Sequence, residues 1–367
     1  MIDERKHAEL LTRYCGEVRR GDEVQIRASV EAMPLVKEIY RSVVSLGAYP
    51  RVAIEDEELQ EIFYRNAPRE LLEYLSPIDK FISENVSVSF AIISSTHVKP
   101  LISIDPEKLK VRSNALRPLT EIFMRRDGEG SLRWTVTLYP TRALAQEANM
   151  SILDYEEFVS HALKLHLPDP VAAWEAQARS QEKIVAFLSK VSELKVKDED
   201  TDLLLRVDGR TWINDEGKRN MPGGEVFTGP VEEATEGHIT FTYPAVWRGY
   251  EVEGVRLRFS RGSVVEASAL KGEEFLKRML EVDEGARRLG EAAFGLNYDI
   301  KRHTKQILFD EKIGGTMHLA LGASYPKSGG RNMSAIHWDM IKDMSRAKVY
   351  ADGELVYERG KFIEEVL

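Results

Sequence analysis

The strongest constraint on the fold is the alternation of strands and helices across the first half of the chain. The sequence predicts strands over 23–27, 50–54, 86–93 and 133–138, and a helix with apolar spacing over 31–46. Strands that are separated by such helices are joined by crossover connections, which favour a parallel sheet. We therefore expect an α/β N-terminal domain with a mostly parallel sheet.

The pattern changes near residue 195. The charged run over 195–202 is typical of a boundary or an edge loop. Beyond it one helix is predicted over about 272–289, and the other predicted elements are strands over 202–208, 238–243, 254–260, 263–268, 291–297, 317–322, 335–341, 346–351 and 354–357. At 367 residues the chain is longer than one core usually supports. We expect an α/β domain over 1–195 and a β-rich α+β domain over 196–367.

Composition excludes several classes of partner. The net charge is −9, so no basic excess exists to neutralise phosphates, and we expect no nucleic-acid partner. Cys15 is the only cysteine, which excludes a thiolate zinc site and leaves His, Asp and Glu as possible metal ligands. The N-terminal residues 1–6 are charged, and no apolar run is long enough to span a bilayer. We expect a cytoplasmic protein with no membrane partner.

The first predicted strand is followed by a turn that argues against dinucleotide binding. Residues 27–30 contain no glycine, whereas a loop that cradles a pyrophosphate needs glycines for close approach of the backbone. We therefore reject this function for the N-terminal domain.

The segment Ile336–Met340 carries the first indication of a metal site. Side chains alternate along a strand, so His337 and Asp339 would share one face while Ile336, Trp338 and Met340 share the other. A carboxylate on an apolar background is costly unless a positive group compensates it. A divalent cation is one such group, although an ordinary hydrogen-bonded pair is also consistent with this segment alone.

Four further polar residues stand at strand ends or beside glycine turns in the same half of the chain. They are Glu225, Glu291, Glu311 and His318. Gly290 is predicted to end the preceding helix, so that Glu291 starts a strand. Each residue alone could be an exposed carboxylate or a satisfied core histidine. Together with the strand pair they form four carboxylates and two histidines, which would repel one another without cations.

The composition of this ligand set indicates the kind of metal. It is rich in oxygen, has two nitrogens and has no sulfur, which suits Zn²⁺, Co²⁺ or Mn²⁺. Six ligands are too many for one tetrahedral zinc, but they suit two metal ions that share a bridging carboxylate. Pairs of this kind hydrolyse peptide or phosphate bonds.

Four ordered blocks of sequence carry a resemblance to a known family. They are NMPGGEVFTGP, DEGARRLGE, FDEKIGGTMHLALGASYP and GGRNMSAIHWDM. These blocks resemble the aminopeptidase T-type (thermophilic aminopeptidase) metallopeptidases, in an archaeal-like variant marked by DEKIGG. The resemblance implies a metalloaminopeptidase of broad specificity with two divalent ions per subunit. It also implies peptide substrates with a free N-terminus and a homodimer.

The same resemblance assigns roles by position. It implies that Glu225, Glu291, His318, His337 and Asp339 are metal ligands, with Glu291 as our choice for the bridging ligand.

Two further residues match the family by position. Glu311 matches an acidic residue that either completes a metal's shell or accepts a proton from the attacking water, although its spacing to His318 differs from that in bacterial members. Tyr325 matches an active-site tyrosine that could donate a hydrogen bond to the oxyanion.

Two alternatives remain open at this point. The first is another two-metal hydrolase, such as a phosphoesterase, which would use the same ligand types. The second is a non-catalytic relative that keeps the fold and uses its cavity for binding.

Overall fold

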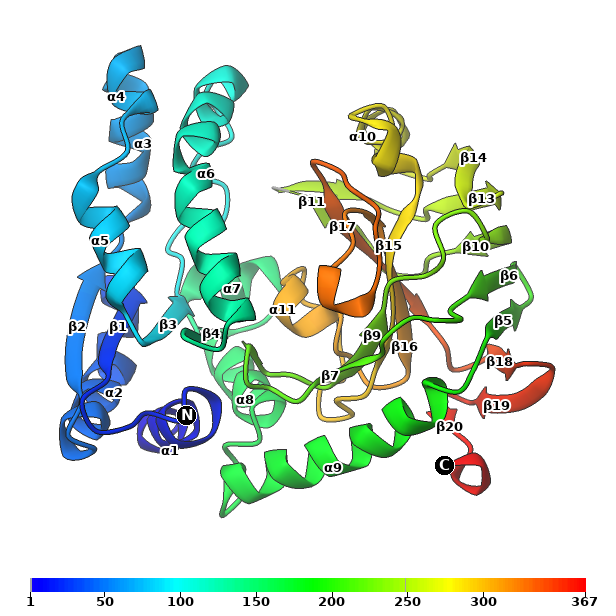
Figure 1. Cartoon of the computed structure of the whole chain (residues 1–367), viewed down its shortest axis with the longest axis horizontal. Helices are drawn as coiled ribbons and strands as arrows, with labels where there is room; N and C mark the ends of the chain where they lie inside the picture. Colours follow the sequence, from blue (N-terminus) through cyan, green and yellow to red (C-terminus); the bar gives the residue numbers. More distant parts are fainter. Residues whose placement is uncertain (1, 248) are drawn as a thin grey trace. The chain divides into compact units, whose positions relative to one another are not determined.

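The computed structural model describes residues 2–247 and 249–367, and it divides into two compact units (Figure 1). The first contains Met1–Val171 and Lys218–Met221, and the second contains Ala172–Gly217 and Pro222–Leu367. Residues 172–195 thus lie in the second unit by their contacts, and a functional boundary at residues 195 and 196 stays a prediction. In the part of the chain that the structure describes, no helix has the length and apolar character needed to cross a membrane.

The first unit contains a parallel sheet, which confirms the predicted α/β class. Its strand order is β2-β1-β3-β4-β8, and every neighbouring pair is parallel. The strands are β1 (Glu23–Ala28), β2 (Tyr49–Ile54), β3 (Val88–Ile93), β4 (Arg133–Leu138) and β8 (Asn220–Met221). The central strands are apolar towards the core, where Val24, Ile26, Val88 and Phe90 are buried.

One helix precedes these strands and the others connect them. They are α1 (Glu4–Glu9), α2 (Met33–Ser45), α3 (Glu57–Asn66), α4 (Arg69–Glu73), α5 (Pro77–Asn85), α6 (Pro106–Gly128), α7 (Arg142–Glu147) and α8 (Ile152–Ala162). Helix α2 shows why the chain is helical here. Pro34 occupies its first turn, where a missing N–H costs little, and Leu35, Ile39 and Val43 recur at four-residue spacing and are buried.

The second unit contains two larger antiparallel sheets, which confirms the β-rich α+β class. The eight-stranded sheet has the order β14-β13-β10-β6-β5-β18-β19-β20, and the five-stranded sheet has the order β17-β16-β15-β9-β7. The first comprises β5 (Glu193–Asp198), β6 (Thr201–Arg206), β10 (Glu236–Thr240), β13 (Arg256–Ser260), β14 (Ser263–Ser268), β18 (Lys348–Ala351), β19 (Glu354–Glu358) and β20 (Lys361–Phe362). The second comprises β7 (Ile213–Asp215), β9 (Glu225–Thr228), β15 (Leu289–Gly295), β16 (Thr316–Gly322) and β17 (His337–Asp343).

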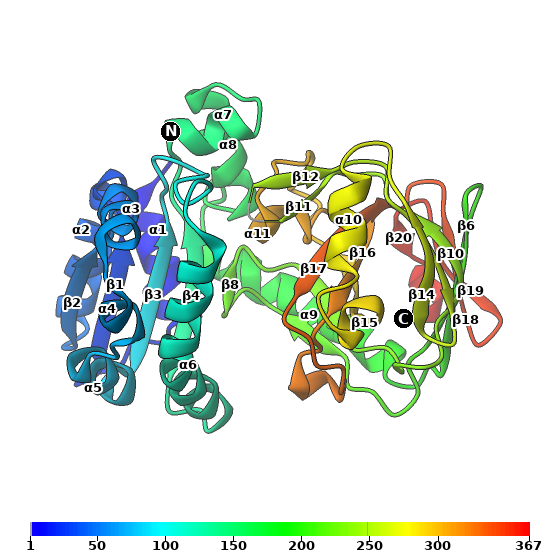
Figure 2. The ribbon, with the colours of Figure 1, turned by 90° about the horizontal axis from the view of Figure 1, so that it is seen from above.

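The remaining elements of the second unit are short, apart from one long helix. They are α9 (Pro170–Leu188), β11 (Ala245–Trp247), β12 (Tyr250–Val252), α10 (Glu273–Met279) and α11 (Ile307–Asp310). One hydrophobic core takes residues from both sheets, including Leu203 and Leu257 of the larger sheet and Phe294, Leu319 and Trp338 of the smaller one. Figure 2 shows the strands of the two sheets on opposite sides of this core.

Two local predictions were wrong. The charged run over 195–202 is not a loop but most of the β5–β6 hairpin. It alternates as a strand should, with Leu194 and Val196 fully buried and Lys195 paired with Asp202 on the outer side at 3.3 Å.

The predicted helix over 272–289 ends early, at Met279, and Gly290 lies within β15 rather than at a helix end. Asp283 explains the break. Its carboxylate accepts hydrogen bonds from the backbone N–H of Ala286 at 2.9 Å and of Ala335 at 2.7 Å, and these compete with helical bonding.

Candidate metal centre

Strand register brings the predicted ligands onto one face of the five-stranded sheet. Ala320 of β16 lies opposite Glu291 of β15 on one side and opposite Asp339 of β17 on the other. Residues that lie opposite one another, or two apart along a strand, share a face. His318 and His337 stand two residues from Ala320 and Asp339, so they share this face as well.

The same face continues onto the next two strands. Glu225 of β9 lies opposite Gly295 of β15, and Asp215 of β7 lies opposite Glu225. The opposite face of the sheet is mostly apolar, and Phe294 and Trp338 from it belong to the hydrophobic core. Polar and apolar side chains therefore alternate along each strand, and the polar ones converge.

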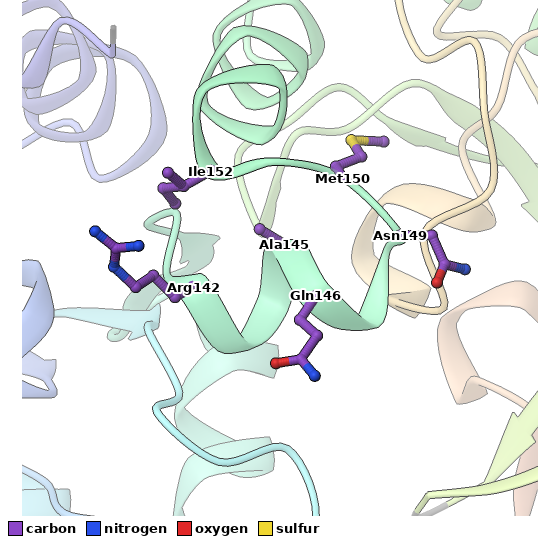
Figure 3. Close-up of a pocket in the computed structure, with 6 residues that line it drawn as sticks. All are labelled: Arg142, Ala145, Gln146, Asn149, Met150 and Ile152. Atoms are coloured by element: carbon purple, nitrogen blue, oxygen red, sulfur yellow. The ribbon is translucent and has the colours of Figure 1, made fainter.

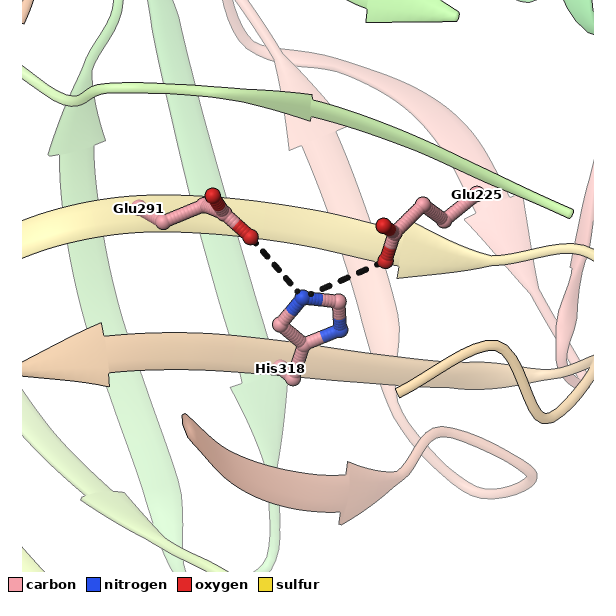
Figure 4. A group of neighbouring side chains, drawn as sticks. All are labelled: Glu225, Glu291 and His318. Atoms are coloured by element: carbon pink, nitrogen blue, oxygen red, sulfur yellow. Dashed lines mark hydrogen bonds and ion pairs between the residues drawn. The ribbon is translucent and has the colours of Figure 1, made fainter. Parts of the chain in front are cut away.

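Glu225, Glu291 and His318 form the first group (Figure 4). His318 Nε2 lies 3.1 Å from Glu291 Oε1 and 3.4 Å from Glu225 Oε2. All three residues are buried, and each offers one ligand atom within 4.8 Å of the others. This geometry suits a divalent cation, because all three groups point at a shared position.

Glu291, His337 and Asp339 form a second group of the same size. His337 Nε2 lies 3.4 Å from Asp339 Oδ1 and 3.9 Å from Glu291 Oε2. His337 Nδ1 donates a hydrogen bond to the carbonyl oxygen of Ala323 at 2.8 Å, which leaves Nε2 available as a ligand. The prediction that His337 and Asp339 share a face of one strand is confirmed.

Glu311 reaches the same place from outside the sheet. It is the residue after α11, and it forms a third group with His318 and Asp339. The structure thus brings together all six residues that were predicted as ligands. Their roles in binding metal stay predictions.

The residues present fit a metal centre. Within the described residues, the buried oxygens Glu225 Oε2 and Asp339 Oδ1 have no hydrogen-bond partner. Buried polar atoms are rarely left in this way, because the loss of hydration is costly. Oxygen and imidazole donors without sulfur suit Zn²⁺, Co²⁺ or Mn²⁺.

Burial and mutual repulsion shift the pKa values of the carboxylates. Burial raises the pKa of Glu311, and it raises the pKa of Glu225 well above its usual value, in both cases against the attraction of Lys312. Asp339 behaves differently. Burial alone would raise its pKa, but His337 outweighs that effect and holds the pKa at about 2.

The pKa values of the two histidines are raised when no metal is bound. Burial alone would lower the pKa of His318, but the hydrogen bond that it donates to Glu291 and the charge of Glu225 raise the pKa to about 9. Asp339 likewise outweighs burial and raises the pKa of His337 to about 11. The carboxylates therefore stabilise positive charge in the site, and either a proton on a histidine or a metal ion can supply it.

Sequence reasoning missed Lys312 and Asp215. The Nζ atom of Lys312 has no exposed surface and pairs with Glu311, with Glu225 at 3.2 Å and with Asp215 at 3.4 Å. A lysine that directly follows a glutamate reads as an ordinary charged turn, so the sequence held little sign of this position. For Asp215 the three-residue strand β7 is too short to give a clear alternating pattern.

Tyr325 lies close in the chain to these elements but outside the three groups. Its ring packs against Phe227 of β9, with ring centroids 6.0 Å apart, and Phe227 shares a face with Glu225 two residues earlier. The structure shows no hydrogen bond from its hydroxyl to a ligand among the described residues. Its catalytic role stays a prediction.

A separate pocket in the first unit has a different character. It has a volume of about 360 Å³ and is lined by Arg142, Ala145, Gln146, Asn149, Met150 and Ile152 (Figure 3). Its lining contains no carboxylate and no histidine. This pocket therefore lacks the groups that bind a divalent cation.

The fold and the converging carboxylates and histidines fit the class of metal-dependent hydrolases. The profile of the family described as thermophilic metalloprotease (M29) matches residues 3–362. The chain belongs to this family. The resemblance to aminopeptidase T-type enzymes is thus confirmed.

Individual relatives match this chain over nearly its whole length. Aminopeptidase T of Thermus thermophilus is 30% identical and is matched over 98% of both chains. Aminopeptidase 2 of Geobacillus stearothermophilus is 27% identical over 96% of this chain and 97% of its own. The solved structure of wild-type AmpT from Thermus thermophilus superimposes with a TM-score of 0.84 at 29% identity, covering 98% of each chain. The chain is accordingly a metalloaminopeptidase, a hydrolase of the exopeptidase class.

Proposed function

We propose that this chain releases N-terminal amino acids one at a time from peptides of varied sequence, using two divalent ions. The observation that carries the proposal is the position of Glu291. It belongs to two groups of potential ligands, one with Glu225 and His318 and one with His337 and Asp339. A carboxylate with one oxygen towards each group is the usual bridge between paired metal ions.

Each of the two groups on the sheet would hold one metal ion. One ion would be held by Glu225, Glu291 and His318, and the other by Glu291, His337 and Asp339. Zn²⁺, Co²⁺ and Mn²⁺ all suit these donors. When bound, such a pair supplies Lewis acidity that polarises the scissile carbonyl and lowers the pKa of a water.

The chain's own residues supply the proton transfer and orientation. Glu311 lies beside His318 and Asp339. In this proposal it either accepts the proton from the attacking water or completes a metal's shell. Tyr325 would donate a hydrogen bond to the oxygen that becomes negative in the transition state. His337, fixed by the carbonyl of Ala323, keeps Nε2 directed at the centre.

Three finer features belong to the same proposal. The substrates are peptides with a free α-amine, since a carboxylate or a metal ion would hold that amine and restrict attack to the first peptide bond. The proposal also includes a homodimer, as the family resemblance implies, and a cytoplasmic location.

The proposal is tested on protein stripped with a chelator and reloaded with Zn²⁺, Co²⁺ or Mn²⁺. We expect two ions per chain by elemental analysis and hydrolysis of a leucyl-arylamide. We expect no hydrolysis of its N-acetylated form or of an aryl phosphate ester. Equal cleavage of the blocked substrate would contradict an aminopeptidase. Preference for the phosphate ester would support a phosphoesterase, and chelator-insensitive, metal-free protein would contradict the metal centre.

A further inference from the structure

Lys312 is a buried cation at the edge of the metal centre. Its side chain has no exposed surface, and its Nζ atom contacts Glu311, Glu225 Oε1 at 3.2 Å and Asp215 Oδ2 at 3.4 Å. Two of these three partners, Glu225 and Glu311, also belong to groups of potential metal ligands. The ammonium group therefore shares carboxylates with the proposed metal ions rather than standing apart from them.

The two carboxylate oxygens of Glu225 contact different groups. Oε1 is paired with Lys312, whereas Oε2 faces His318 Nε2 at 3.4 Å and has no hydrogen-bond partner within the described residues. Glu311 likewise gives Oε1 to Lys312. Lys312 thus holds one oxygen of each carboxylate, and the other oxygen of Glu225 faces the group of potential ligands.

Charge balance points to the same role. The carboxylates around the site are Asp215, Glu225, Glu291, Glu311 and Asp339. Against these five negative charges the protein supplies one fixed positive charge from Lys312, and two divalent ions with neutral histidines would balance the remaining four. Without Lys312 the same two ions would leave an uncompensated buried charge, which is strongly destabilising.

We propose that Lys312 is a positioning residue of the metal centre, which orients Glu225 and Glu311 for ligation through one oxygen each. It also keeps the acidic cluster folded while no metal is bound. The proposal rests on the two-metal function given above. Asp215, whose Oδ2 faces Lys312, completes the arrangement as a counter-charge rather than as a ligand.

The test compares Lys312→Met with the double variant Lys312→Met/Asp215→Asn, in which one negative charge is removed with the positive one. Lys342→Met is a matched control. Lys342 is equally buried and pairs with Asp198 at 3.0 Å and Asp200 at 3.1 Å, but it lies opposite Met317 and so on the other face of the sheet. Unfolding midpoints are measured at pH 8 with chelator and with Zn²⁺, and bound metal is counted by elemental analysis.

We expect Lys312→Met to lower the midpoint of the metal-free protein by roughly 10 °C and that of the loaded protein by less than half as much. The double variant should recover most of the loss. Lys342→Met should lower both midpoints alike. Equal losses with and without metal for Lys312→Met, or no recovery in the double variant, would overturn the proposal. Wild-type protein that binds no metal would instead refute the two-metal function, so the two failures are distinguishable.

Discussion

Glu291 Oε1 lies 3.1 Å from His318 Nε2 across the boundary between β15 and β16. The two residues are not directly opposite, because His318 faces Ala293 and Glu291 faces Ala320. Their contact is diagonal, and it is possible because both of the facing residues are alanines. The small side chains leave space above the sheet, where the ligands meet and where a metal ion would lie.

Replacing Glu291, the proposed bridging ligand, tests the centre most directly. We expect Glu291→Gln to reduce bound metal from two ions towards one and to lower kcat/KM at least ~100-fold, since loss of a ligand or its support typically costs 10–100-fold or more. Elemental analysis and leucyl-arylamide hydrolysis measure both effects. Glu266→Gln is the control, because Glu266 is an exposed strand residue that forms an ion pair with Arg258 and should behave as wild type.

Glu311→Gln separates the two roles open to that residue. If Glu311 is the general base, kcat should fall about 100-fold or more while both ions stay bound. A lower metal count would assign it to a metal's shell instead. Near-normal turnover with both ions present would exclude the base role.

The space above the two alanines predicts a contrast between neighbouring positions. Ala320→Val adds methyl groups on the ligand face, between Glu291 and Asp339, and should reduce metal content with little loss of fold. Ala292→Val adds the same volume on the core face of β15, where Ala292 is fully buried, and should cost about 1–3 kcal/mol of stability instead. Calorimetry and metal analysis of both variants check the contrast, and the reverse pattern would contradict the assigned faces.

His7 predicts a loss of stability in acid that is independent of the metal centre. Burial lowers the pKa of His7 to about 3, and its Nε2 lies 2.9 Å from Thr137 Oγ1. Between pH 6.5 and 3 the unfolded chain binds the proton and the folded chain does not, so stability falls as the pH falls. At pH 5 this costs about 2 kcal/mol relative to pH 7 or above.

His7→Gln removes the titrating group and should flatten this part of the pH profile. Chemical unfolding of the wild type and of His7→Gln is compared between pH 5 and 8, with chelator throughout so that metal loss does not contribute. Parallel profiles for the two proteins would show that His7 is not the source. The sign is opposite for a group with a raised pKa, so the direction of the difference is itself informative.

The sequence predicted the class of both units and all six residues that converge, but it did not predict how they converge. Alternation in His337-Trp338-Asp339 identifies a strand with one apolar face, because period-two patterns report burial directly. The diagonal pairing of Glu291 with His318 depends on register between strands, which local patterns do not encode. Sequence reasoning also missed Lys312, because a buried ammonium is stabilised only by partners distant in the chain, such as Asp215 and Glu225.

The centre is assembled from strands that are distant in the chain. Its candidate ligands span residues 225 to 339 and stand on β9, β15, β16 and β17, with Glu311 after α11. No shorter segment contains a complete set, and long-range contacts of this kind form late in folding. A chain growing from its N-terminus therefore carries no working protease until β17 has joined the sheet, which confines peptide hydrolysis to molecules whose second unit is already folded.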